Sequence, residues 1–245
     1  MSTEWAAEQL RVSLFSSEAL GVTEDDWCAL TGQSEAETRR SIPGGRVFSG
    51  RFEGGLLNLS GVLNRTDIVF SAAPPEEASA EPQLPTTGSW ESARDKFYDF
   101  AHVWVETRKV AVTRLAFGAV LLCETTDRKS SYEVLKSLLT SVEVVPDRMQ
   151  ELLYRVNWPT ESGLVQGLKV NRVTSWSALE IRLATLEVTG SPHLVPSNVL
   201  NVVRLEIDNN TDADRTISIP QAQIGAVFKE LITFASEIAR NGEVK

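Results

Sequence analysis

The sequence has few of the residues that perform chemistry at neutral pH. Its 245 residues include two histidines and two cysteines. Histidine is the commonest general base and a frequent metal ligand, so candidates for either role are scarce. Neither Cys28 nor Cys123 has a second cysteine or histidine two to four residues away, which excludes the usual zinc-ligand spacing. Gly-x-Ser-x-Gly and phosphate-loop motifs are missing too. We expect no cofactor and no metal, and these absences favour a protein that is not an enzyme.

Long apolar segments are also missing. No apolar run approaches the roughly 18 residues that a membrane helix needs. Residues 1–8 have neither the basic nor the apolar part of a signal peptide. The two cysteines show no disulfide-type spacing, which suits a reducing compartment. We therefore expect a cytoplasmic protein that does not bind membranes.

A basic excess is missing as well. The chain has 33 Asp and Glu against 24 Lys and Arg, a formal net charge of −9. Binding to phosphate backbones depends on clustered basic side chains, so nucleic acid is a disfavoured partner. The acidic excess is concentrated in residues 1–90, which hold 13 acidic and 6 basic residues. A basic or neutral protein partner fits this balance better.

Alternation of apolar and polar residues predicts several strands. The clearest signal is a hairpin, in which runs at 46–53 and 56–63 are joined by Gly54 and Gly55. Residues 110–123 are apolar on both faces, which is typical of a strand at the centre of a covered sheet. Further strands are expected at 8–15, 66–72, 152–156, 168–170, 178–188 and 200–207, a loop at 33–45 and a polar turn at 208–214.

Apolar spacing at three and four residues predicts helices. Thr23 is expected to cap a short helix that ends at Gly32. Ser130 and Glu133 form a capping-box pattern at the start of another helix. The remaining helices are expected at 90–105 and, after Pro220, up to about residue 241.

The order of these elements lacks the regular strand and helix alternation of a doubly wound sheet and predicts an α+β fold. We expect one large mixed or antiparallel sheet of about eight strands with helices packed on one face. The chain is interpreted as a single domain over residues 1–245, with two sub-halves (1–72 and 90–245) as an alternative. A loop at 73–88 with four prolines would join these sub-halves.

Three arginines are the most informative charged residues. Arg65 and Arg172 each follow an asparagine, and Arg114 lies inside the apolar run at 110–123. A guanidinium group in or near a sheet is costly to desolvate and needs a carboxylate, carbonyl groups or a ligand. One interpretation is structural bracing at strand ends, with Asp67 as a partner. The other is that the three arginines converge on one anionic ligand or on the carboxylate of a partner.

Two tryptophans and two histidines are weaker candidates. Trp158 and Trp176 lie in polar, turn-like stretches. Exposed tryptophan is a common interface anchor, which makes both candidate partner contacts, although a partly buried structural role is more common for this residue. His102 is expected on a helix as a surface or packing residue, and His193 in an exposed loop.

Residues 208–214 place oxygen ligands at the first, third, fifth and seventh positions, as a calcium loop does. Ala213 stands where the sixth position requires glycine, and Ile219 where the twelfth requires glutamate. A solvated turn is therefore the preferred interpretation, with weak calcium binding as the alternative.

Three stretches resemble a known family. They are Thr-Arg-Leu-Ala-Phe-Gly-Ala at 113–119, Leu-Tyr-Arg-Val-Asn-Trp-Pro at 153–159 and Leu-Lys-Val-Asn-Arg-Val-Thr-Ser-Trp-Ser at 168–177. They look like a widespread bacterial family of uncharacterised proteins, some of them encoded within defence loci. More loosely, the size and acidity are similar to an accessory protein of type III-E CRISPR loci, whose effectors act with a caspase-like protease. The resemblance implies a bacterial accessory protein and assigns no catalytic or binding residues.

These observations predict a non-catalytic, protein-binding accessory protein of the bacterial cytosol, in a regulatory or antiviral defence system. The alternative is a binder of a small anionic ligand, or an enzyme, whose pocket is lined by the arginines and Asp67. A local basic face in residues 91–245, which are nearly balanced in charge, would be needed for nucleic-acid binding. The oligomeric state is left open. The candidate contact residues are Arg65, Asp67, Arg114, Arg172, Trp158 and Trp176.

Overall fold

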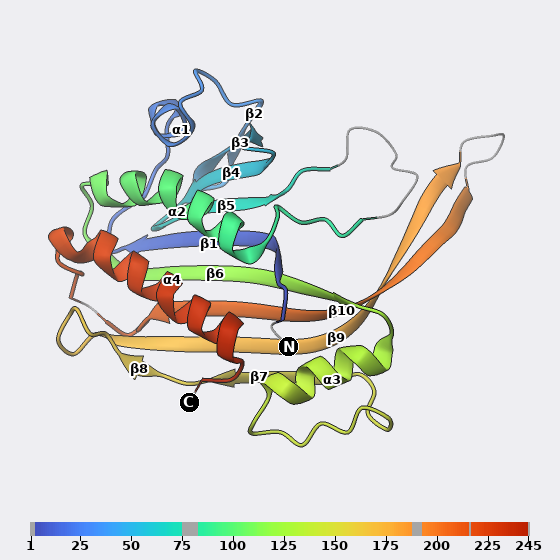
Figure 1. The fold of residues 1–245 in the computed structure, drawn as a ribbon. Coiled ribbons are helices and arrows are strands. Elements are labelled where there is room, and N and C mark those ends of the chain that lie inside the picture. The colour runs from blue at the N-terminus through green and yellow to red at the C-terminus, as the bar shows by residue number, and fades with distance from the viewer. Residues whose placement is uncertain (1–2, 75–82, 188–192, 216, 245) are drawn as a thin grey trace.

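The computed structural model describes residues 3–74, 83–187, 193–215 and 217–244, and side chains outside 183–198. Within these ranges the chain forms ten strands and four α-helices (Figure 1). The strands are β1 (Ala6–Ser16), β2 (Thr38–Ile42), β3 (Gly45–Phe52), β4 (Gly55–Val62), β5 (Arg65–Ala72), β6 (Val112–Thr125), β7 (Leu153–Asn157), β8 (Thr160–Glu161), β9 (Lys169–Glu187) and β10 (His193–Thr211). The helices are α1 (Glu24–Thr31), α2 (Trp90–Thr107), α3 (Arg128–Leu138) and α4 (Ile224–Asn241), the last preceded by a short 3-10 turn, Gln221–Gln223.

All ten strands belong to one antiparallel sheet. The strand order is β2-β3-β4-β5-β1-β6-β10-β9-β7, and β8 pairs with β9 beyond the end of β7. The predicted α+β class and large sheet with helices on one face are confirmed, with ten strands in place of about eight. None of the described helices combines the length and apolarity that a bilayer crossing needs.

The order of elements repeats about the β1 and β6 pair. On one side, β1 is followed by α1, then by the four strands β2 to β5, and then by α2. On the other, β6 is followed by α3, then by the four strands β7 to β10, and then by α4. In each series the last strand returns to lie beside the first, β5 beside β1 and β10 beside β6. This repeat divides the chain between α2 and β6, whereas the predicted sub-halves divide at 73–88. A single sheet runs through both parts.

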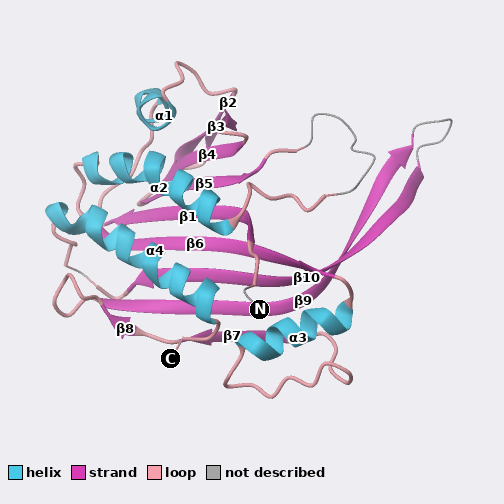
Figure 2. Ribbon diagram, viewed as in Figure 1, coloured by secondary structure: helices cyan, strands magenta, loops and turns pink. Residues whose placement is uncertain are grey.

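The two faces of the sheet differ. Apolar side chains at alternating positions of β1 and β6, such as Val12 and Phe117, are fully buried on the side of α2 and α4. The residues that alternate with these along each strand, such as Arg11 and Gly118, face the opposite side of the sheet. Figure 2 shows the described helices on one side of the sheet only. We refer to the side without helices as the open face.

Two predicted irregular segments are wrong because strand partners far away in the sequence override local propensity. The predicted loop at 33–45 contains β2, which pairs with β3. The predicted polar turn at 208–214 starts only after Thr211, because residues 208–210 pair with both β6 and β9. Asn209 is buried and donates a hydrogen bond to the Leu231 carbonyl at 2.9 Å, so 208–214 does not have the geometry of a calcium loop.

Two local details also differ from the prediction. The hairpin between β3 and β4 turns at Glu53 and Gly54, both with positive φ (49° and 78°), and not at Gly54 and Gly55. Helix α3 is capped by Asp127 and not by Ser130. The Asp127 carboxylate accepts a hydrogen bond from the Ser130 backbone N–H at 2.7 Å.

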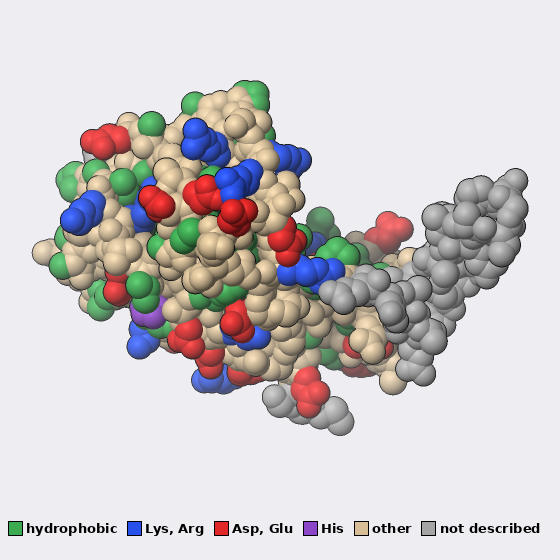
Figure 3. All heavy atoms as spheres, turned by 90° about the horizontal axis from the view of Figure 1, so that it is seen from above, with side chains coloured by type: hydrophobic (Ala, Val, Ile, Leu, Met, Phe, Trp, Pro, Cys, Tyr) green, Lys and Arg blue, Asp and Glu red, His purple; other side chains and the backbone are tan. Residues whose placement is uncertain are grey.

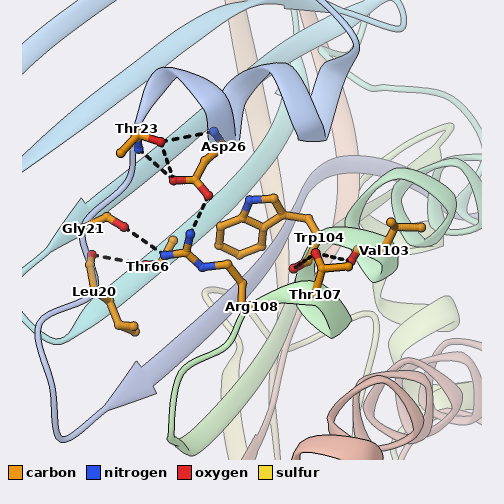
Figure 4. A network of polar contacts seen from close by, with 9 residues as sticks. All are labelled: Leu20, Gly21, Thr23, Asp26, Thr66, Val103, Trp104, Thr107 and Arg108. Carbon is orange, nitrogen blue, oxygen red and sulfur yellow. Dashed lines mark hydrogen bonds and ion pairs between the residues drawn. The ribbon is translucent and has the colours of Figure 1, made fainter.

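A cross-link between elements holds α1 in place (Figure 4). Arg108, just after α2, donates to the Asp26 carboxylate at 2.5 Å and to the Gly21 carbonyl at 2.9 Å, and its guanidinium lies 4.7 Å from the centre of the Trp104 ring. The same carboxylate accepts from the Thr23 backbone N–H at 2.8 Å. Asp26 thus completes the predicted cap of α1 and also binds α1 to the end of α2.

Replacing Arg108 with alanine is expected to lower the free energy of unfolding by about 2 kcal/mol, because the partly buried Asp26 carboxylate loses its counter-ion. Chemical denaturation monitored by circular dichroism would measure the change. Arg148→Ala is the matched control, since Arg148 is exposed. Equal stability of the two variants would contradict this role for Arg108.

Candidate functional site

A band of polar side chains crosses the open face, starting on β5 and β1. Arg65 and Asp67 on β5 form an ion pair with 2.7 Å between Nη2 and Oδ1. The Ser13 hydroxyl on β1 donates to the same carboxylate oxygen at 2.5 Å. Phe15 lies opposite Arg65 on one side and Arg114 on the other, and both guanidinium groups lie near its ring, 5.2 and 5.0 Å from the centroid. Three of the sequence-predicted residues therefore come together: Arg65, Asp67 and Arg114.

Asparagine side chains extend this band to the far edge of the sheet. Arg114 donates to Asn210 Oδ1 on β10 at 3.0 Å, and Asn171 on β9 donates to the same oxygen at 3.2 Å. Asn157 on β7 donates to Asn171 Oδ1 at 2.9 Å. An amide side chain can donate and accept at once, so such residues can link across several strands. The band thus spans six neighbouring strands, with hydrogen bonds between β5 and β1 and from β6 to β7, and with the Phe15 ring between Arg65 and Arg114 joining the two parts.

A hollow of about 330 Å³ lies beside the band on the open face. Arg204 in this hollow forms ion pairs with Glu206 and with Glu8, the latter at 3.5 Å. Its charge is therefore balanced within the protein. The hollow lies over β6, β10 and β9 and is lined by Glu8, Gln9, Arg11, Gly118, Val120, Arg155, Val173, Ser175, Arg204, Glu206 and Asp208, among others.

Two further arginines, Arg11 and Arg155, line the hollow. Among the described residues, neither Arg11 nor Arg155 forms an ion pair or hydrogen bond through its side chain. The Arg11 Nε is buried without a hydrogen-bond acceptor. Gly118 lies opposite Arg11 in the sheet, and the guanidinium group lies over it. Unpaired guanidinium groups are available to acceptor groups of a ligand or a partner.

Arg172 lies on the opposite face of the sheet from Arg65 and Arg114. It pairs in register with Asn209, which is buried on the helix side, and it is only 8% exposed. Its Nε donates to the Trp158 carbonyl at 2.8 Å, and its guanidinium lies 5.8 Å from the Phe234 ring. Burial lowers the pKa of Arg172, although Glu237 opposes this shift. The predicted convergence of three arginines is therefore wrong for Arg172.

Trp158 contacts a carboxylate that no sequence pattern singles out. Glu243, just beyond α4, is buried and accepts hydrogen bonds from the Tyr154 hydroxyl at 2.8 Å and from the Trp158 indole at 3.1 Å. The backbone N–H groups of Ser141 and Thr140 donate to its other oxygen at 2.9 and 3.2 Å. Burial raises the pKa of Glu243, but the hydrogen bonds from Tyr154, Ser141 and Trp158 outweigh burial and lower it. Glu243 thereby joins the end of α4 to β7 and to the segment after α3.

Trp176 has a structural environment. Its side chain is fully buried on the helix side of β9, its indole N–H donates to the Thr174 hydroxyl at 3.0 Å, and its ring lies 6.3 Å from that of Trp5. The sequence stretch around it is polar because its neighbours, such as Ser175, point to the open face. In this conformation no partner can reach Trp176.

His102 and Cys123 lie apart from the open face. His102 stacks on Tyr98, with ring centroids 4.7 Å apart, as a packing residue of α2. Cys123 is buried, and burial raises the pKa of its thiol. The side chain of His193 lies outside the described side chains. Among the residues that are described, no group of three or more His, Cys, Asp or Glu is arranged to hold a metal ion.

The three stretches that carry the family resemblance lie on β6, on β7 and on β9 together with the segment just before it, and they supply Arg114, Gly118, Arg155, Asn157 and Asn171 to the open face. The resemblance itself stays a prediction. No protein-family model matches the chain, and no curated protein matches it either.

Proposed function

We propose that this chain is a non-catalytic binding protein that docks another protein on the open face of its sheet. The observation that carries this proposal is the arrangement of the sheet itself. The described helices cover one face, and the other carries a band of side chains across six strands, held by hydrogen bonds and by the contacts of two arginines with Phe15. Side chains that are already held in place lose little conformational entropy when a partner binds, and this favours recognition.

The charges of the open face point to a partner with carboxylates in the contact area. Arg11 and Arg155 are not neutralised within the described protein, whereas Arg204 and Arg65 are paired with acids. Arginine is enriched at protein interfaces because its planar group binds carboxylates through two hydrogen bonds. Figure 3, which views the molecule from above and not onto the open face, shows basic and acidic side chains interspersed, so that side offers no continuous basic stripe for nucleic acid.

The proposed setting is the bacterial cytosol, within a regulatory or antiviral defence system. It is supported by the resemblance of residues 113–119, 153–159 and 168–177, and by the two cysteines, which are both free thiols.

The test is a pull-down with the tagged chain from its source cells, followed by affinity measurements with the purified partner. Arg155→Glu is expected to weaken binding at least tenfold, because an exposed arginine without internal contacts becomes a repelling acid. Arg148→Glu makes the same charge change on an exposed residue of the segment after α3 and should leave the affinity unchanged. A partner that binds wild type, Arg155→Glu and Arg11→Glu equally well would overturn the proposal.

A second candidate function is favoured by the hollow alone. A volume of about 330 Å³ with two arginines that have no counter-ion in the described part of the chain suits a small anionic ligand. Co-purification of a stoichiometric small acid, with no protein partner in the pull-down, would support this function over protein docking.

A further inference from the structure

The strands β9 and β10 extend well beyond the body of the sheet (Figure 1). They pair with each other along their whole length, from the pair of Val170 in β9 with Thr211 in β10 to the pair of Glu187 with His193. The neighbouring strands are much shorter. β6 pairs with β10 only at 201–210, and β7 pairs with β9 only at 173–177. From Ala178 outward, β9 has no described strand on its outer edge. A two-stranded ribbon is only marginally stable in water, so an additional strand here would add stability.

This edge of β9 is accessible. β7 begins at Leu153, and Glu151 just before it has a positive φ of 55°. A hollow of about 580 Å³ then opens beside Ala178 and Leu179. Two apolar side chains lie exposed at this corner on the same face, Leu153 at 71% and Leu179 at 39%. Exposed apolar groups beside an unpaired strand edge are typical of a pairing site.

The sequence of the edge is complementary to itself. Residues 178–184 read Ala-Leu-Glu-Ile-Arg-Leu-Ala, which is the same in both directions except that Glu180 and Arg182 exchange places. If two copies pair antiparallel about Ile181, each Glu180 faces Arg182 of the second copy. Opposite charges directly across an antiparallel pair stabilise it. Within one chain Glu180 and Arg182 form an exposed ion pair with each other, 3.6 Å between Oε2 and Nη2, and in the dimer each would exchange this partner for its counterpart on the second copy.

We propose that two copies of this chain form a dimer through antiparallel pairing of residues 178–184 about a twofold axis at Ile181. The pairing between the two copies starts at Ala178, because the preceding residue, Ser177, already pairs with Leu153 of β7. A twofold axis of this kind is perpendicular to the sheet, so it leaves the two open faces on the same side. The two sheets then become continuous through their ribbons.

Other strand edges are unsuited to pairing with their own copy. About Arg40 in β2, and about Arg155 in β7, self-pairing would place one arginine directly opposite another. The outer edge of β10 carries Pro196, which has no N–H to donate, and a bulge between Pro196 and Asn198. The outer edge of β9 has neither obstacle.

The test is the molar mass in solution, measured by size-exclusion chromatography with light scattering across micromolar concentrations. Wild type is expected to be a dimer. Glu180→Arg and Arg182→Glu should each raise the dissociation constant by on the order of tenfold or more, because each creates two like-charge pairs. The double variant Glu180→Arg with Arg182→Glu restores both opposite-charge pairs and should be dimeric again. Mixing the two single variants should also give a dimer, since each then faces its complement.

Arg39→Glu in β2 is the matched control, because it changes the charge of another edge strand and should leave the mass unchanged. A monomeric wild type would overturn the proposal. So would single variants that dimerise as tightly as wild type, or a double variant that stays monomeric although circular dichroism shows it folded. The docking proposal is tested separately by Arg155→Glu, which lies outside residues 178–184.

Discussion

Replacing Glu243 with alanine is expected to lower the free energy of unfolding by about 3 kcal/mol. The substitution removes the acceptor for Tyr154, Trp158 and two backbone N–H groups, and it leaves these donors unpaired in a largely buried place. Each buried donor without a partner costs about 1–3 kcal/mol, and relaxation or water recovers part of the sum. Denaturant unfolding monitored by tryptophan fluorescence would measure the loss, and Trp158 would report on the site itself.

Glu143→Ala is the control for this prediction, since Glu143 is exposed and should change stability by less than about 0.5 kcal/mol. If both variants were equally stable, the hydrogen bonds of Glu243 would contribute nothing to the fold.

Lowering the pH should weaken the hydrogen bonds that the Glu243 carboxylate accepts. The pKa of Glu243 lies below its ordinary value of 4.5 in the folded protein. Its carboxylate therefore contributes stability that is fully present above the ordinary pKa and is lost as the pH falls through the lower, folded-state pKa. The difference in Tm between wild type and Glu243→Gln is thus expected to be largest near neutral pH and to shrink in acid. A difference that did not change with pH would show that the charge of Glu243 is not involved.

Replacing Trp176 with alanine is expected to cost about 4 kcal/mol of unfolding free energy. The side chain is fully buried beside Trp5, and removing a buried tryptophan leaves a large cavity. The indole also donates to Thr174, which would lose this partner. Urea denaturation would measure the cost.

Trp176→Phe keeps most of the volume and should cost much less, while Ile217→Ala changes an exposed side chain and should cost little. A stable Trp176→Ala variant that failed only in partner binding would restore the interpretation of Trp176 as an interface anchor.

The local parts of this fold could be predicted from the sequence because short-range patterns determine them. Thr23 and Gly32 bound α1 as expected, since a cap depends only on residues within one turn. The hairpin of β3 and β4 and the closing helix α4 were found for the same reason. β2 was missed because its residues, Thr-Arg-Arg-Ser-Ile, show little strand pattern and take their structure from β3.

The candidate site was predicted only in part. The sequence singled out Arg65, Asp67 and Arg114 because charges beside or within apolar strands need partners, and the sheet brings these three together around Phe15. It could not separate them from Arg172, because the face on which a strand residue lies depends on register, and one residue of shift reverses it. Arg11 and Arg155 were passed over because each lies in an ordinary alternating strand, and only the strand order brings them to one hollow.

The amino-acid sequence by itself determined the α+β class, the helix ends, the acidic balance and the self-complementary stretch at 178–184, since each depends on composition or on near neighbours. The tertiary structure decided which face each arginine occupies, that Trp176 is enclosed, that Glu243 reaches Trp158, and that no described strand pairs with the outer edge of β9 from Ala178 onward. These features arise from contacts between residues tens to more than a hundred positions apart, and the pairing of ten strands, which no local pattern encodes, fixes them.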